Sequence, residues 1–197
     1  MLDLEPAVRM LAEVITAVRD DQLSAPTPCE KSNLGDLLDH VDALSIAFTA
    51  AASKTPLPAG NQAPSADGSR LGTEWRTRIP QRLSALADAW RDADAWVGMT
   101  TPGAVDLPAE LAGVIALDEV VIHGWDIAVA SGQSYNSEPD LLEAIYGFVQ
   151  PTAAQNPAGT PGLFGPPVPV NEDAPLLDRL LGLTGRDPNW HPPDSDG

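Results

Sequence analysis

Apolar residues recur at three- and four-residue intervals in five stretches of the chain, which is the spacing of one face of an α-helix. These stretches cover residues 5–24, 34–48, 71–97, 108–131 and 141–149. Strand-like alternation of apolar and polar residues is not found between them. The pattern therefore predicts an all-α fold organised as a four-helix bundle.

Several expected helix ends carry recognisable signals. Asn33 precedes the second helix as an N-cap, and Asp36 follows three residues later, which approximates a capping box. Gly132 marks the end of the fourth helix. Pro80 lies inside the third helix, and we expect it to kink or shorten that helix.

The composition divides the chain into a bundle and an extension. Residues 56–72 are rich in Pro, Gly, Ala and Ser, which predicts a flexible loop. From residue 151 the chain again becomes rich in Pro and Gly, with one short helix closed by Gly182 and Gly185. We predict a bundle over residues 1–150 and a C-terminal extension over residues 151–197 that packs on it, within a single domain.

The charge of the chain narrows its partners. There are 28 acidic and 11 basic residues, and the net charge is -17, which argues against nucleic acid and against anionic membranes. The N-terminus lacks the basic and apolar regions of a signal peptide, and the single cysteine, Cys29, excludes an internal disulfide. We expect a cytoplasmic protein that handles small molecules. Apolar faces on its short helices could support a dimer.

The candidate chemistry lies on two of the expected helices. Glu119 and His123 are four residues apart, which places them on one helix face with their Cβ atoms about 6 Å apart. Their apolar neighbours turn both groups inward, where unpaired polar groups are costly. His40 lies on or beside the apolar stripe of the second helix. A divalent metal, zinc or another ion such as nickel or cobalt, would satisfy all three and keep an open coordination position.

Several side chains admit two interpretations. Glu119 and His123 could form a simple ion pair without metal. Asp36 and Asp126 each lie one turn from a histidine and could orient it, or be solvated surface acids. Cys29 could be a nucleophile, although a small buried thiol is commoner. Arg186 could hold an anionic group or cap its helix, and we favour the cap.

Other residues are not expected to carry chemistry. His191 lies in the tail and is expected to stay apart from the site. Four aromatic residues are expected to serve as core: Trp75, Trp90, Trp125 and Tyr146. The residues alone identify no catalytic acid or base and no cofactor-binding residue other than the metal ligands.

Three segments resemble one protein family. They are Thr27-Pro-Cys-Glu30, Leu34 to His40, and Glu119-Val-Val-Ile-His-Gly-Trp-Asp-Ile-Ala128. They resemble the mycothiol-dependent maleylpyruvate isomerase N-terminal family, which belongs to the DinB-like metal-binding four-helix bundles. The segment from Gly182 to Trp190 is similar to an uncharacterised actinobacterial branch of it.

The resemblance implies a site and an activity. It implies that His40, Glu119 and His123 hold a divalent metal, commonly zinc, and that a low-molecular-weight thiol such as mycothiol binds there as the nucleophile. Ser32 stands where many relatives have Trp, and we expect the separate C-terminal domain of the full isomerase to be missing. The resemblance therefore favours an enzyme, a thiol-dependent transferase or isomerase acting on a small electrophile. A non-catalytic metal-containing protein that binds a small ligand is the alternative, and a metal-free structural network is a third.

Overall fold

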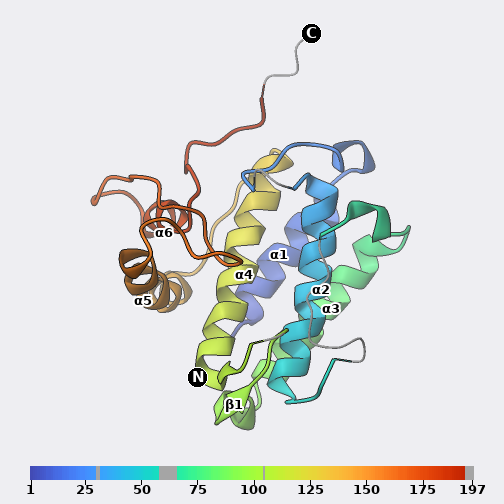
Figure 1. Ribbon diagram of the computed structural model, residues 1–197. Coiled ribbons are helices and arrows are strands. Elements are labelled where there is room, and N and C mark those ends of the chain that lie inside the picture. The colour runs from blue at the N-terminus through green and yellow to red at the C-terminus, as the bar shows by residue number, and fades with distance from the viewer. Residues whose placement is uncertain (30–31, 58–65, 104, 194–197) are drawn as a thin grey trace.

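The computed structural model describes residues 1–29, 32–57, 66–103 and 105–193. Within these residues the chain forms six α-helices and a two-stranded antiparallel sheet (Figure 1). The helices are α1 Glu5–Ala17, α2 Leu34–Ala52, α3 Trp75–Trp90, α4 Ala109–Ala130, α5 Pro139–Gln155 and α6 Leu176–Leu183. The strands are β1 Met99–Thr100 and β2 Leu107–Pro108. The predicted all-α class is confirmed, although the apolar pattern did not predict the small sheet.

The first four helices form the bundle. Helix α1 packs against α3 and α4, and α2 packs against the same two helices. The order around the bundle is therefore α1, α3, α2, α4, with α2 directly beside α4. This adjacency brings the second and fourth helices of the chain together, and the candidate ligands lie on these two helices.

Helix α4 is the central element of the molecule. The bundle helices α1 and α2 cover part of it, while α5 packs on another part and α6 packs on α5 (Figure 1). Sixteen of its 22 residues are buried for this reason. Polar groups on α4 therefore lie in the interior and need partners there.

Some helix boundaries agree with the sequence and others do not. The predicted capping box is confirmed, since Asp36 N donates to Asn33 Oδ1 (2.9 Å) and Asn33 N donates to Asp36 Oδ2 (3.2 Å). The first helix ends at Ala17 rather than near residue 24, because Val18 is extended. The third helix spans Trp75–Trp90 rather than residues 71–97, and it continues through Pro80.

The C-terminal part of the chain also differs in detail. Helix α5 runs to Gln155, beyond the predicted end at residue 149, and it passes through Pro151. Of the predicted loop 56–72, residues 58–65 lie outside the described residues, and a short 3₁₀ turn forms at Gly68–Arg70. No helix in the described ranges has the length and apolar character that crossing a membrane requires.

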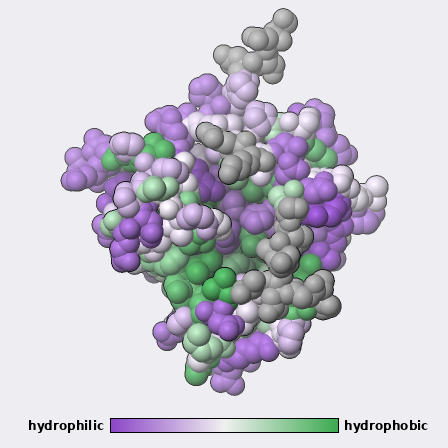
Figure 2. All heavy atoms as spheres, viewed as in Figure 1, coloured by the Kyte–Doolittle hydropathy of each residue, from purple (hydrophilic) through white to green (hydrophobic). Residues whose placement is uncertain are grey.

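The aromatic residues lie mainly in the core. Trp75, Trp90 and Trp125 are buried, as expected. Tyr146 is only half-buried and lies against the guanidinium group of Arg179. Figure 2 shows apolar side chains gathered low on the face where α4 meets α5. A groove between these helices is lined by Leu111, Val114, Ala144, Gly147, Phe148, Pro151, Thr152 and Gln155.

Candidate metal centre

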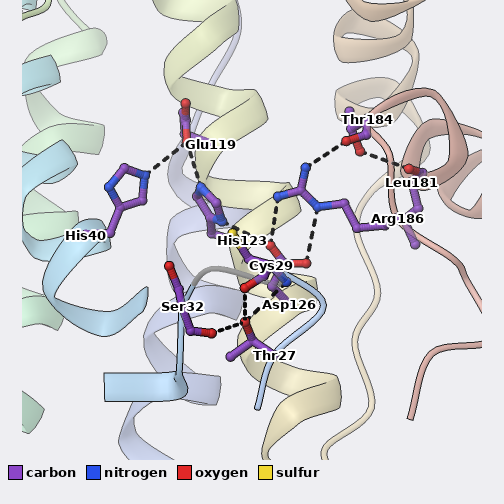
Figure 3. A network of polar contacts seen from close by, with 10 residues as sticks. All are labelled: Thr27, Cys29, Ser32, His40, Glu119, His123, Asp126, Leu181, Thr184 and Arg186. Carbon is purple, nitrogen blue, oxygen red and sulfur yellow. Dashed lines mark hydrogen bonds and ion pairs between the residues drawn. The ribbon is translucent and has the colours of Figure 1, made fainter. Parts of the chain in front are cut away.

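The structure brings the three predicted ligand residues together between α2 and α4 (Figure 3). His40, Glu119 and His123 each offer one ligand atom, and these atoms lie within 4.8 Å of one another. His123 Nε2 is 2.9 Å from Glu119 Oε2, and His40 Nε2 is 3.9 Å from the same oxygen. The two imidazole rings meet edge to face, with their centroids 4.9 Å apart. Both rings therefore present Nε2 toward one carboxylate oxygen.

The second ring nitrogen of His123 has its own partner. Asp126, one turn along α4, lies with Oδ2 3.1 Å from His123 Nδ1. Its side chain is fully buried. Of the two interpretations of Asp126, orientation of the imidazole is the one that the geometry supports. Asp36 does not take this role toward His40, because its carboxylate caps α2 and accepts the backbone N–H of Gly68 (2.8 Å).

Arg186 completes this chain of polar contacts from the C-terminal segment. Its Nη2 donates to Asp126 Oδ2 (3.0 Å) and its Nε to Asp126 Oδ1 (3.3 Å). The favoured interpretation of Arg186 as a helix cap is incomplete: Nη1 does donate to the carbonyl of Thr184 (2.9 Å), but the other two contacts reach α4. The sequence carried no signal for them, because Arg186 and Asp126 are 60 positions apart.

The amino-acid sequence matches one protein family over most of this structure. Residues 4–128 match the Mycothiol maleylpyruvate isomerase N-terminal domain. The chain belongs to this family. The family predicted from the sequence segments is therefore confirmed. All three candidate ligands lie within the matched residues of this family member, whereas Arg186 lies outside them.

Individual relatives agree with this assignment. Two uncharacterized proteins of Mycobacterium tuberculosis, from strains CDC 1551 / Oshkosh and ATCC 25618 / H37Rv, are each 28% identical over 188 residues, covering 89% of this chain and 91% of theirs. A crystal structure of the mycothiol-dependent maleylpyruvate isomerase superposes with a TM-score of 0.60 at 20% identity. That match covers 78% of this chain and 69% of the other, and it shows a shared fold.

The neighbours of His123 favour its protonated form. Burial lowers the pKa of His123, but hydrogen bonds with Asp126 and Glu119 outweigh it and raise the pKa to about 10. Burial raises the pKa of Glu119, but the hydrogen bond and the charge of His123 lower it by more, so the net shift is downward. Burial and the nearby charge of His123 lower the pKa of His40. These shifts favour an ionised Glu119 and a protonated His123 beside a neutral His40.

Asp118 is a polar residue at the site that sequence reasoning missed. It immediately precedes Glu119, it is 2% exposed, and its Oδ1 has no hydrogen-bond partner among the described residues. Burial, followed by the charge of Glu119, raises its pKa to about 8. Its position inside the apolar run of the fourth helix was the available signal.

Cys29 belongs to the loop that leads into α2. Its backbone N–H donates to Thr27 Oγ1 (3.2 Å), and Thr27 Oγ1 donates in turn to the carbonyl of Ser32 (2.7 Å), as Figure 3 shows. Cys29 is half-buried and lies close enough to Arg186 to contribute to the raised pKa of that guanidinium group. The structure thus places Cys29 at the edge of the polar network rather than in the apolar core.

The donor set fits a divalent metal. Two imidazole nitrogens and one carboxylate oxygen are ligands that zinc and its neighbours accept. The contact from His123 Nδ1 to a carboxylate is the arrangement that metal-binding histidines usually show. The recess on the bundle side of Glu119 has a volume of only about 10 Å³, which is room for about one water molecule. Of the three ligand side chains, His40 is the most exposed, at 30% against 15% for Glu119 and 10% for His123.

Proposed function

We propose that this chain binds a divalent metal and is a thiol-dependent transferase or isomerase that acts on a small electrophile, with a mycothiol-type thiol as the nucleophile. The observation that carries this proposal is the convergence of three ligand atoms within 4.8 Å in a member of the Mycothiol maleylpyruvate isomerase N-terminal domain family. The crystal structure with the same fold is of an enzyme named for mycothiol and maleylpyruvate. A cytoplasmic location, where such thiols are reduced, is part of the proposal.

Each residue has a defined part in this function. His40 and His123 would supply nitrogen ligands, and Glu119 would supply an oxygen. The metal, zinc or an ion such as nickel or cobalt, would supply a Lewis acid that lowers the pKa of a bound thiol. Three protein ligands leave a position for that thiol. The thiol proton would pass to solvent, and the thiolate sulfur would then add to an electrophilic carbon of the substrate as the π bond of that carbon breaks and its electron pair moves to a conjugated carbonyl oxygen. For isomerisation, return of that pair would re-form the π bond and expel the thiolate.

The test compares turnover in the wild type and in two variants that each lack one histidine. Purified, untagged, zinc-loaded protein is assayed with mycothiol against maleylpyruvate and a panel of small electrophiles. We expect turnover by the wild type and by His191→Ala, because His191 is exposed and outside the site. We expect His40→Ala to fall to the uncatalysed rate. Wild-type turnover no higher than that of His40→Ala would contradict the enzyme proposal.

A second candidate is a non-catalytic protein that binds a small ligand through its metal. It is favoured by the pairing of the charged groups around the ligands: Asp126 with Arg186, and Glu119 with His123. Each of these four groups already has a charged partner in the fold, and no separate general acid or base has been identified among them. Tight, metal-dependent binding of a thiol or small electrophile that is recovered chemically unchanged would support this candidate against the enzyme.

A further inference from the structure

We propose that Arg186 is a positioning residue for the metal ligand His123 and acts through Asp126. This inference rests on the proposed metal site. It adds a residue from the C-terminal segment, which lies beyond the residues that match the family. Three features of the structure support the inference. They are the backbone conformation that places Arg186, the side-chain contacts of Arg186, and the effect of those contacts on His123.

The backbone places Arg186 by a specific helix ending. After α6, Gly185 N donates to the carbonyl of Gly182 (3.1 Å) and Arg186 N donates to that of Leu181 (2.8 Å). These are the two hydrogen bonds of a Schellman motif, which needs a residue with positive φ, and Gly185 has φ +87°. A Cβ on Gly185 would lie 2.9 Å from Gly165 Cα, so glycine is required here for space as well. Arg186 therefore leaves α6 in a fixed direction, toward α4 (Figure 3).

The guanidinium group occupies both oxygens of Asp126. Its Nε and Nη2 lie 3.3 and 3.0 Å from Oδ1 and Oδ2, and both side chains are buried. A planar guanidinium matches a carboxylate with two parallel hydrogen bonds, which a lysine ammonium cannot do. Without this cation, Asp126 would be a buried carboxylate that faces only His123. Arg186 thus fixes the plane of the Asp126 carboxylate.

The orientation of Asp126 in turn determines which nitrogen of His123 faces the metal ligands. Asp126 Oδ2 accepts from Arg186 and is also 3.1 Å from His123 Nδ1. A proton held on Nδ1 leaves Nε2 directed toward Glu119, where a metal would bind. Arg186 can therefore change metal affinity although its side-chain hydrogen bonds go to Asp126 and Thr184 and not to a ligand residue.

The experiment is a double-mutant cycle on zinc affinity. Dissociation constants are measured by competition with a chromophoric chelator for the wild type, Arg186→Gln, Asp126→Asn and the double variant. Loss of an outer partner of a metal-binding histidine typically weakens metal binding by about 10–100-fold, and we expect at least about tenfold from Arg186→Gln. In the Asp126→Asn background the same change should have less than about a threefold effect, because its route to His123 is already broken.

A matched control separates this role from general loss of a cation. Arg179→Gln removes another arginine of the same segment, one that lies over Tyr146 and does not contact Asp126. It should keep wild-type zinc affinity. Wild-type affinity in Arg186→Gln, or an equal loss from Arg186→Gln in both Asp126 backgrounds, would overturn the inference.

Two further measurements keep the test decisive. If Arg186→Gln does not fold, Arg186→Lys replaces it: the charge stays but the paired hydrogen bonds are lost, so zinc affinity should still fall, and wild-type affinity would overturn the inference. In the zinc-loaded wild type, nitrogen NMR should show the His123 proton on Nδ1, and an unprotonated Nδ1 would also overturn it. A wild type that binds no zinc would overturn the proposed function, whereas zinc binding that is indifferent to Arg186 overturns only this inference.

Discussion

Asp118 shows what burial does to a single carboxyl group. It is 2% exposed on α4, and its pKa rises to about 8 from the value of 3.8 expected in an unfolded chain. Between these two values the folded protein binds more protons than the unfolded protein. The contribution of Asp118 to stability therefore falls as the pH rises through this window.

Asp118→Asn should remove this pH dependence, because an amide has the same shape as a carboxyl group but does not ionise. In chelator-treated protein, we expect the unfolding free energy of the variant to rise relative to that of the wild type by up to about 5 kcal/mol between pH 4 and pH 8. Urea unfolding across this pH range measures the difference. Asp140→Asn, on the exposed first turn of α5, controls for the loss of a surface charge. A difference between Asp118→Asn and wild type that does not vary with pH would contradict the assignment.

The predictability of the site varies from residue to residue for a physical reason. Glu119 and His123 could be predicted as neighbours because a spacing of four residues on a helix brings their side chains together. His40 could be predicted as a third ligand because the chain has only three histidines and because His40 lies in a segment that resembles the family. Arg186 and Asp126 could not be paired, because periodicity assigns a residue to a helix face without naming its partner on another element. Proximity across these elements is set by the packing of α5 on α4 and of α6 on α5, which the sequence pattern does not contain.

At the scale of elements, local signals predicted some helix ends, and tertiary contacts determined the others. The capping box of Asn33 and Asp36 and the positive φ of Gly132 are local, and both agree with the sequence. Helix α1 stops early at a point that a distant side chain stabilises: the guanidinium of Arg76 donates to the carbonyl of Val18 at 2.7 and 3.1 Å. Helix α5 continues through Pro151 while its inner face packs on α4 and α6.

Gly124 on α4 packs closely against Tyr135 in the segment that follows this helix. It follows His123, and a Cβ there would lie 2.6 Å from Tyr135 Oη and 2.8 Å from its ring. Tyr135 is a rigid, partly buried side chain that packs against the core, so it cannot move aside easily. We expect Gly124→Ala to lower the unfolding free energy by about 1–3 kcal/mol despite the better helix propensity of alanine.

Gly147→Ala is the matched control on α5, since a Cβ there would meet nothing within 4 Å. It should be neutral or raise the unfolding free energy by up to about 1 kcal/mol. Urea unfolding of both variants gives the comparison. Equal stability of Gly124→Ala and Gly147→Ala would show that Tyr135 does not pack closely on α4.

At the scale of the whole molecule, the order of helices around the bundle decides where function can arise. Because α2 lies beside α4, ligands that are distant in the sequence meet only in the folded chain. Helix α5 packs on α4, and α6 packs on α5. Arg186 follows α6 and so reaches Asp126 on α4. The candidate metal site is therefore coupled to the fold: an unfolded chain has no equivalent arrangement of His40 with the Glu119 and His123 pair.

This coupling makes stability a direct measure of metal binding, independent of any enzymatic assay. A ligand that binds only the folded protein, at 100 times its dissociation constant, raises the unfolding free energy by about 2.7 kcal/mol. Free zinc buffered at that level should produce this increase in the wild type and in His191→Ala, since His191 is exposed and outside the site. It should produce almost none in His40→Ala, because the α2 ligand is lost while the ion pair between Glu119 and His123 remains. Urea unfolding with and without zinc measures all three proteins. Equal zinc stabilisation of His40→Ala and wild type would mean that the metal binds elsewhere, and would remove the basis for assigning the site to α2 and α4.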